Sequence, residues 1–175
     1  MVATAEAVRE EQGIPEHVPH KNLVIMAWSG DLDRIWPTLI LGTTGAAMGM
    51  ETTIFFTFWG LFPLVREDVR ITGDNWMQKL LATMDRPGLE HVKLGKMNFA
   101  GAGPAMMRKL AREHHVASPE ELIALAKDLG VKLVPCQMTM DLLGLHADDL
   151  IDGLEPPAGA TTALVEAQDA ITLFI

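Results

Sequence analysis

The sequence predicts an α/β fold built on a doubly wound, mainly parallel sheet. Short, continuous apolar runs recur along the chain, as they do in strands that are buried on both faces. Segments with the start and stop residues of helices separate these runs. The first strand, helix and strand follow one another closely enough to form a βαβ unit, which requires parallel strands and a right-handed crossover.

The first strand and helix are expected within residues 23–48. The apolar run 23–28 predicts a buried strand, and a Ser-Gly-Asp turn follows it. A helix is then expected to run to about Met48, with Asp31 or Asp33 as its N-cap. Pro37 suits the first turn of a helix better than its interior, which leaves the start of this helix open.

The middle of the chain is less regular. Residues 52–58 are rich in β-branched and aromatic side chains and predict a second strand. Residues 59–103 have weak periodicity, which indicates a functional excursion or an interface element. The acidic residues 1–20 contain Pro15 and Pro19 and are expected to form a flexible arm. The organisation is therefore an arm followed by a single domain over 21–175.

Helices and strands return in the last third of the chain. Ser118 and Glu121 fit a capping box, with Pro119 at the first helical position. The expected elements are a helix over 104–115 with Pro104 at its start, a helix over 118–129 ended by Gly130, a strand over 131–135, a short helix over 137–143 stopped by Gly144, a helix over 161–168 and a strand over 171–175.

Composition excludes several classes of protein. The net charge of -9 argues against nucleic acid as a partner, because phosphate binding needs a basic face. The uncharged stretches on either side of Glu51 are 16 and 14 residues long, and a membrane-spanning helix needs about 20. Residues 133–175 contain no Lys or Arg and seven acids, which fits either a solvated edge or a surface that selects a basic partner.

Cys136 is the only cysteine, which excludes an internal disulfide and favours a reducing, cytoplasmic setting. It follows a predicted strand and begins a predicted helix, and reactive groups in open α/β sheets gather at this edge. A helix N-terminus lowers the pKa of a thiol, as a nucleophilic sulfur requires. A lone cysteine can equally be a small buried hydrophobe, and solvent access separates the two interpretations.

The other residues with chemical potential favour structural roles, so no metal or cofactor is predicted. Methionines beside the cysteine are expected in the core, histidines at the surface or an interface, and clustered aspartates on a solvated face. A Gly-rich loop fits left-handed backbone better than an anion cradle. These residues are Met138 and Met140; His91, His114, His115 and His146; Asp148, Asp149 and Asp152; and residues 101–104.

Several segments together resemble the DsrE/DsrF/DrsH-like family, in its longer DsrE2/DsrE3-type branch. The resemblance covers roughly residues 21–175. It implies a five-stranded parallel sheet with helices on both faces, assembly into homo-oligomers, and sulfur transfer through a persulfide on Cys136 with a small TusA-like carrier. The segments are residues 29–33, 47–51, 53–61, 96–99, 103–104, 106–107, 131–133, 136–141 and 152–153.

Three functional hypotheses therefore remain. The first is a sulfur-relay protein that uses Cys136 as a persulfide carrier. The second is a non-catalytic oligomeric scaffold, and the third is an α/β protein that binds a small ligand at the carboxyl edge of its sheet. Aromatic and methionine side chains in residues 59–103 are expected to contact another subunit.

Overall fold

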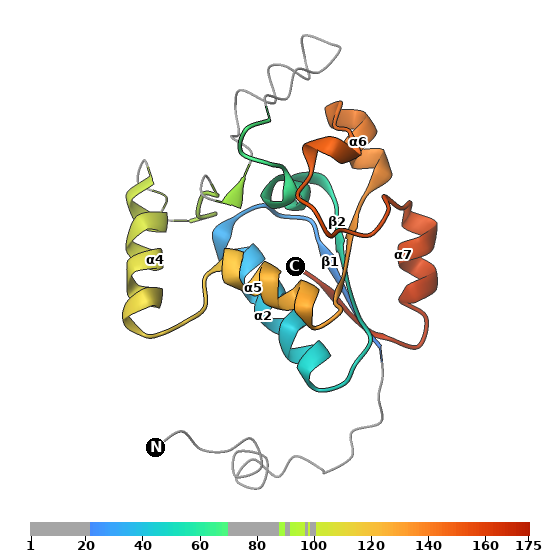
Figure 1. The fold of residues 1–175 in the computed structure, drawn as a ribbon, viewed down its shortest axis with the longest axis horizontal. Helices are drawn as coiled ribbons and strands as arrows, with labels where there is room; N and C mark the ends of the chain where they lie inside the picture. Colours follow the sequence, from blue (N-terminus) through green and yellow to red (C-terminus); the bar gives the residue numbers. More distant parts are fainter. Residues whose placement is uncertain (1–21, 70–87, 90–91, 97, 99–100) are drawn as a thin grey trace, which may run out of the picture.

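The computed structural model describes residues 22–69, 88, 89, 92–96, 98 and 101–175 (Figure 1). The predicted arm over 1–20 and much of the excursion over 59–103 lie outside these residues. In chain order, the described elements are β1 (Leu23–Ala27), α2 (Leu32–Ala47), β2 (Thr52–Phe56), the 3-10 helix η1 (Phe58–Leu64), α4 (Ala102–Glu113), α5 (Pro119–Asp128), β3 (Lys132–Pro135), α6 (Gln137–Leu143), the 3-10 helix η4 (Ala147–Asp149), α7 (Ala160–Glu166) and β4 (Ile171–Phe174).

The sheet is parallel and doubly wound, as predicted. Its four described strands are ordered β3-β2-β1-β4, so the chain starts in the middle and winds outward in both directions. The register pairs Ile25 of β1 with Ile54 of β2 and with Leu173 of β4. The fifth strand that the resemblance implied is absent from the described part of the chain.

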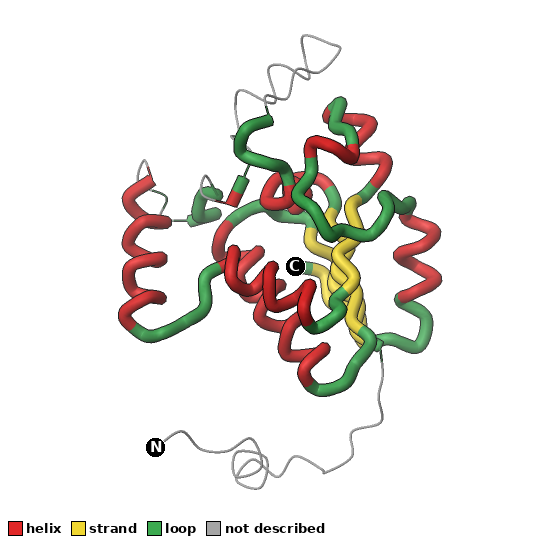
Figure 2. The backbone as a smooth tube through the Cα atoms, in the orientation of Figure 1, coloured by secondary structure: helices red, strands yellow, loops and turns green. Residues whose placement is uncertain are grey.

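Helices cover both faces of this sheet (Figures 1 and 2). On one face lie α2 and α5, which bury Ile35, Leu39 and Ala126 in the main core together with Ile25 and Ile54. On the other face lies α7, which places Ala163 in a smaller cluster with strand residues. The α7 side is the more thinly covered, because Ala163 is the one buried residue of that helix.

The second strand ends earlier than its sequence predicted. β2 stops at Phe56, and Phe58 adopts a left-handed backbone with φ 47°, which turns the chain into η1. Residues 60–65 of this turn are buried, and four of them, Leu61, Phe62, Leu64 and Val65, belong to the main core. Phe62, which was expected to contact another subunit, is therefore core within its own chain. Trp59, a second side chain on which that expectation rested, is 39% exposed. The remaining five, Trp76, Met77, Met84, Met97 and Phe99, lie outside the described residues.

The helix boundaries confirm some of the predicted helix starts and correct others. The capping box of α5 is present, since the Glu121 N–H donates to Ser118 Oγ at 3.2 Å and the Ser118 N–H donates to Glu121 Oε2 at 2.7 Å. Asp31 is the N-cap of α2, but Pro37 lies inside that helix, where packing on the sheet outweighs the missing N–H. None of the helices in the described ranges is long and apolar enough to span a membrane.

Candidate functional site

Cys136 lies at the carboxyl end of β3 and forms the N-cap of α6, as the sequence predicted. Its N–H donates to the carbonyl of Phe56 at 2.9 Å, which prolongs the pairing of β3 with β2 by one residue. Its carbonyl accepts the N–H of Met140 at 3.1 Å, the first bond of the helix. Sheet and helix therefore fix the backbone of the cysteine from both sides.

A third segment, around Ala158 and just before α7, covers the cysteine. The N–H of Gln137 donates to the Ala158 carbonyl at 3.0 Å, and the N–H of Ala158 donates to the Pro135 carbonyl at 3.0 Å. Cys136 is consequently 2% exposed and packs in a cluster with Phe55, Val134 and Ala163. The thiol is thus covered, which the sequence had left open.

Two hydroxyl groups lie next to the cysteine. Thr139, on the first turn of α6, is 2% exposed, and its Oγ1 is 3.2 Å from Oγ1 of Thr57. Thr139 Oγ1 also accepts the N–H of Phe58 at 3.0 Å. This bond ties α6 to the left-handed turn that follows β2.

The surroundings of the sulfur favour its ionised form. Burial raises the pKa of the Cys136 thiol, but hydrogen bonds to the ionised sulfur from the hydroxyl and N–H of Thr139, the hydroxyl of Thr57 and the N–H of Met138 lower it by more. The net pKa lies below the ordinary value. A buried structural cysteine without such donors has a raised pKa, so this thiol differs from an inert one.

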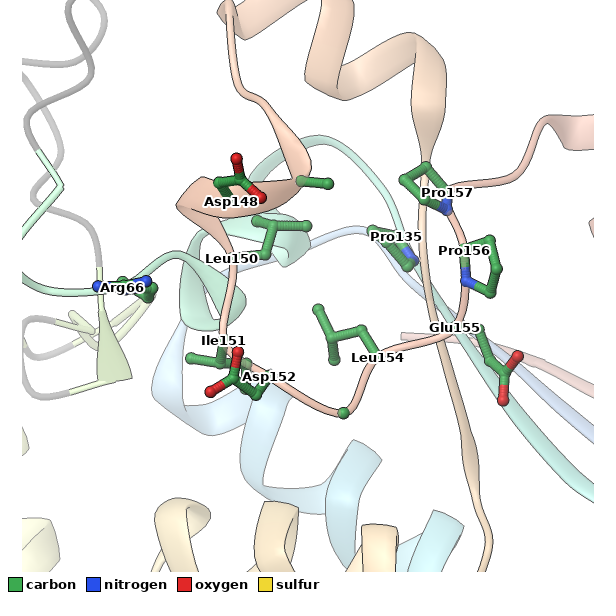
Figure 3. A pocket seen from close by; sticks show the side chains of 12 residues that line it. Arg66, Pro135, Asp148, Leu150, Ile151, Asp152, Leu154, Glu155, Pro156 and Pro157 are labelled. Atoms are coloured by element: carbon green, nitrogen blue, oxygen red, sulfur yellow. The ribbon is translucent and has the colours of Figure 1, made fainter.

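A hollow of about 440 Å³ opens beside the end of β3 (Figure 3). Pro135, Pro156 and Pro157 line one side of it, and Arg66 lies on the other. Asp148 and Asp152 contribute carboxylates, so the lining is mixed rather than apolar. Pro135 directly precedes Cys136, but Cys136 itself does not line the hollow.

The other candidate residues differ in their exposure to solvent and in their backbone conformation. Met140 is buried as predicted, whereas Met138 is 63% exposed, contrary to the prediction, because it lies on the outward face of α6. His114 and His115 are exposed at the end of α4. Gly101 has the left-handed backbone that its loop predicted, with φ 94°. The described residues hold no group of three or more potential metal ligands.

Sequence reasoning missed both threonines. Thr139 carried a usable signal, because a residue three positions after an N-cap faces the side chain of that cap. Thr57 carried none, since its place beside the cysteine follows from the pairing of β2 with β3, where Phe56 lies opposite Pro135.

The chain is similar in sequence to several known proteins. The model of the DsrE/DsrF/DrsH-like family matches residues 19–174. The chain is 38% identical over 156 residues to the uncharacterised protein YrkE of Bacillus subtilis, covering 89% of this chain and 97% of that protein. It is 35% identical over 158 residues to the sulfur carrier protein DsrE2 of Allochromatium vinosum, covering 89% and 98%.

Among solved structures, the chain resembles the protein of unknown function MTH1491 from Methanobacterium thermoautotrophicum. The TM-score is 0.47 at 12% identity, over 89% of this chain and 99% of that one. The family match spans the whole described sheet together with the cysteine at its carboxyl edge. This chain belongs to the DsrE/DsrF/DrsH-like family.

Proposed function

We propose that this protein carries sulfane sulfur as a persulfide on Cys136 and exchanges it with a TusA-like carrier protein. Membership of the family and the relative named as a sulfur carrier support a sulfur-relay role. The observation that carries the proposal is the position of Cys136 at the carboxyl end of β3 and the N-cap of α6, beside the hydroxyls of Thr139 and Thr57. These neighbours lower the pKa of a thiol that burial alone would raise. The thiolate is the species that attacks a sulfane sulfur, so the site favours the reactive form.

Sulfur exchange has to be intermolecular in this proposal. The chain has one cysteine, so neither a second thiol nor a disulfide within the chain is available to release the sulfur. Residues 133–175, which carry Cys136, contain seven acids and no Lys or Arg. A carrier with a basic surface around its own thiol suits this segment. Free thiols on both partners suit a reducing, cytoplasmic setting.

Incubation with a low-molecular-weight persulfide, followed by intact-mass measurement, tests the proposal. The native protein should gain the mass of one sulfur atom, because the Cys136 thiolate takes the outer sulfur and the donor leaves as a thiolate. Cys136→Ser is the matched control and should gain nothing. Dithiothreitol should return the loaded protein to its original mass. A folded wild-type chain that never gains sulfur would contradict the proposal.

A specific observation favours the alternative of a non-catalytic scaffold, namely the 2% exposure of Cys136. In that case the cysteine is one more small side chain in the cluster with Phe55 and Val134. Cys136→Ala would then leave every property except stability unchanged. The hollow beside Pro135 keeps the small-ligand alternative open, but its lining contains no residue of the cysteine cluster.

Assembly into homo-oligomers is part of the proposal. Exposed apolar side chains gather on α7 and on the edge strand β4: Leu164, Val165, Ile171 and Phe174. Apolar groups that are exposed in this way commonly mark contacts between subunits. Light scattering of the full chain at micromolar concentration should therefore give a multiple of the 19.1 kDa chain mass. A mass equal to one chain would contradict it.

A further inference from the structure

The two threonine hydroxyls beside Cys136 form a polar pair in which Thr139 is buried and Thr57 is half-buried. Their oxygens are 3.2 Å apart, and Thr139 is almost completely enclosed. Thr57 follows β2 and Thr139 belongs to α6, so the pair joins the two elements that hold the cysteine. Burying a hydroxyl group costs free energy unless its hydrogen bonds are made, so hydrogen-bond partners are expected for the Thr139 hydroxyl.

One of the two hydroxyl protons is not used in the hydrogen bond between the threonines. Each hydroxyl has one proton and two lone pairs, and a single proton bridges the two oxygens. If Thr57 donates, the oxygen of Thr139 accepts both that proton and the Phe58 N–H, and the proton of Thr139 is free. If Thr139 donates instead, the proton of Thr57 is free. In either arrangement, the pair has one hydroxyl proton to offer to a third group.

We propose that the Thr57–Thr139 pair donates this remaining proton in a hydrogen bond to the sulfur of Cys136 and holds that sulfur as a thiolate. Both threonines are then positioning residues for the sulfur chemistry, and this role rests on the proposed function. The Phe58 N–H supports the arrangement because it occupies a lone pair of Thr139 that could otherwise accept a thiol proton. Both hydroxyls contribute to lowering the thiol pKa, which agrees with donation toward the sulfur.

The hydroxyl pair also affects the transfer of sulfur from the Cys136 persulfide to an acceptor. The thiolate of an acceptor attacks the outer sulfur of the Cys136 persulfide and forms a new S–S bond, while the old S–S bond breaks. The outer sulfur keeps its proton, and the electron pair of the broken bond remains on Cys136, which leaves as a thiolate. A leaving thiol of lower pKa leaves faster. The hydroxyl pair therefore favours the hand-off of sulfur to an acceptor.

Thiolate titration tests the pair directly. The chain has no tyrosine, so the ultraviolet absorbance difference between wild type and Cys136→Ser reports the thiolate without interference from tyrosinate. The titration midpoint should move to higher pH in Thr139→Val and in Thr57→Val, each paired with its own Cys136→Ser double variant. Thr139→Ser keeps a hydroxyl and should restore the wild-type midpoint. If Thr139→Val fails to fold, Thr57→Val alone decides.

A second readout separates this inference from the proposed function. Protein loaded with sulfur should pass it to glutathione about fivefold more slowly in either valine variant than in Thr139→Ser, the factor that one ordinary hydrogen bond represents. If no variant loads but the midpoints shift, the carrier function fails and the hydroxyl pair stands. A folded valine variant with the wild-type midpoint overturns the inference, whether or not the protein carries sulfur.

Discussion

Replacing Gly60 by alanine is expected to lower the free energy of unfolding by about 3 kcal/mol or more. A Cβ atom at this position would lie 2.2 Å from the carbonyl oxygen of Ala27 and 2.7 Å from its carbon. Both are backbone atoms at the end of a central strand, so no rotation of a side chain can relieve the clash. The same carbonyl accepts the N–H of Thr57 at 2.9 Å, which prevents it from moving away freely.

Urea unfolding measures this cost, and Gly159→Ala is a matched control. A Cβ at Gly159 meets nothing within 4 Å, and the residue has φ -89°, which any amino acid adopts. Its substitution removes only a favourable N-cap residue, for which a loss below about 1 kcal/mol is expected. Equal unfolding midpoints for the two variants would mean that the turns after β1 and β2 are not packed as closely as described.

The strands and most helices could be predicted because their signals are local. Leu23, Val24 and Ile25 form an unbroken apolar run, and Ser118 with Glu121 forms a capping box. The end of β2 could not be predicted, because Thr57 and Phe58 have high strand propensity and only packing forces Phe58 into a left-handed turn. At the end of β2, tertiary contacts therefore override the local propensity.

The position of the site could be predicted from the sequence, but the surroundings of Cys136 could not. A lone cysteine between a strand and a helix is visible in the sequence, and Cys136 lies at that junction. Its burial depends on Ala158 and Ala163, which approach from a different part of the chain. The apolar cover and the place of Thr57 beside the cysteine arise from non-local packing, so no local pattern reveals them. The place of Thr139 follows instead from its position three residues after the N-cap Cys136.

Cys136 in the native protein is expected to react with iodoacetamide at least about a hundredfold more slowly than in the unfolded chain at the same pH, since 2% exposure requires an opening before attack. Within a single chain, α7 is the element over Cys136 that can open at least cost. Among its residues Ala163 alone is buried, while Leu164 and Val165 are exposed. The native rate should therefore depend on urea far more weakly than global unfolding does.

The variant Ala163→Gly tests whether α7 is the element that has to open before Cys136 can react. Glycine costs about 1 kcal/mol within a helix, and the lost methyl group removes about 0.8 kcal/mol of apolar burial. If α7 must unfold to expose the sulfur, the alkylation rate should rise roughly ten- to twentyfold, since 1.36 kcal/mol corresponds to a factor of ten. Ala111→Gly weakens α4, which lies on the opposite side of the molecule in Figure 1, and should leave the rate unchanged.

These rates also decide between the functions proposed for the chain. A rate that rises in Ala163→Gly and varies little with urea means that a small, local motion delivers the thiolate to a sulfur donor or acceptor. Loading with sulfur should then accelerate in the same variant by a similar factor. An alkylation rate with the urea dependence of global unfolding means that no folded state exposes Cys136. In that case α7 and the segment at Ala158 cover the sulfur until the whole domain unfolds. Under that outcome the cysteine is a packing residue, and the scaffold alternative replaces the carrier.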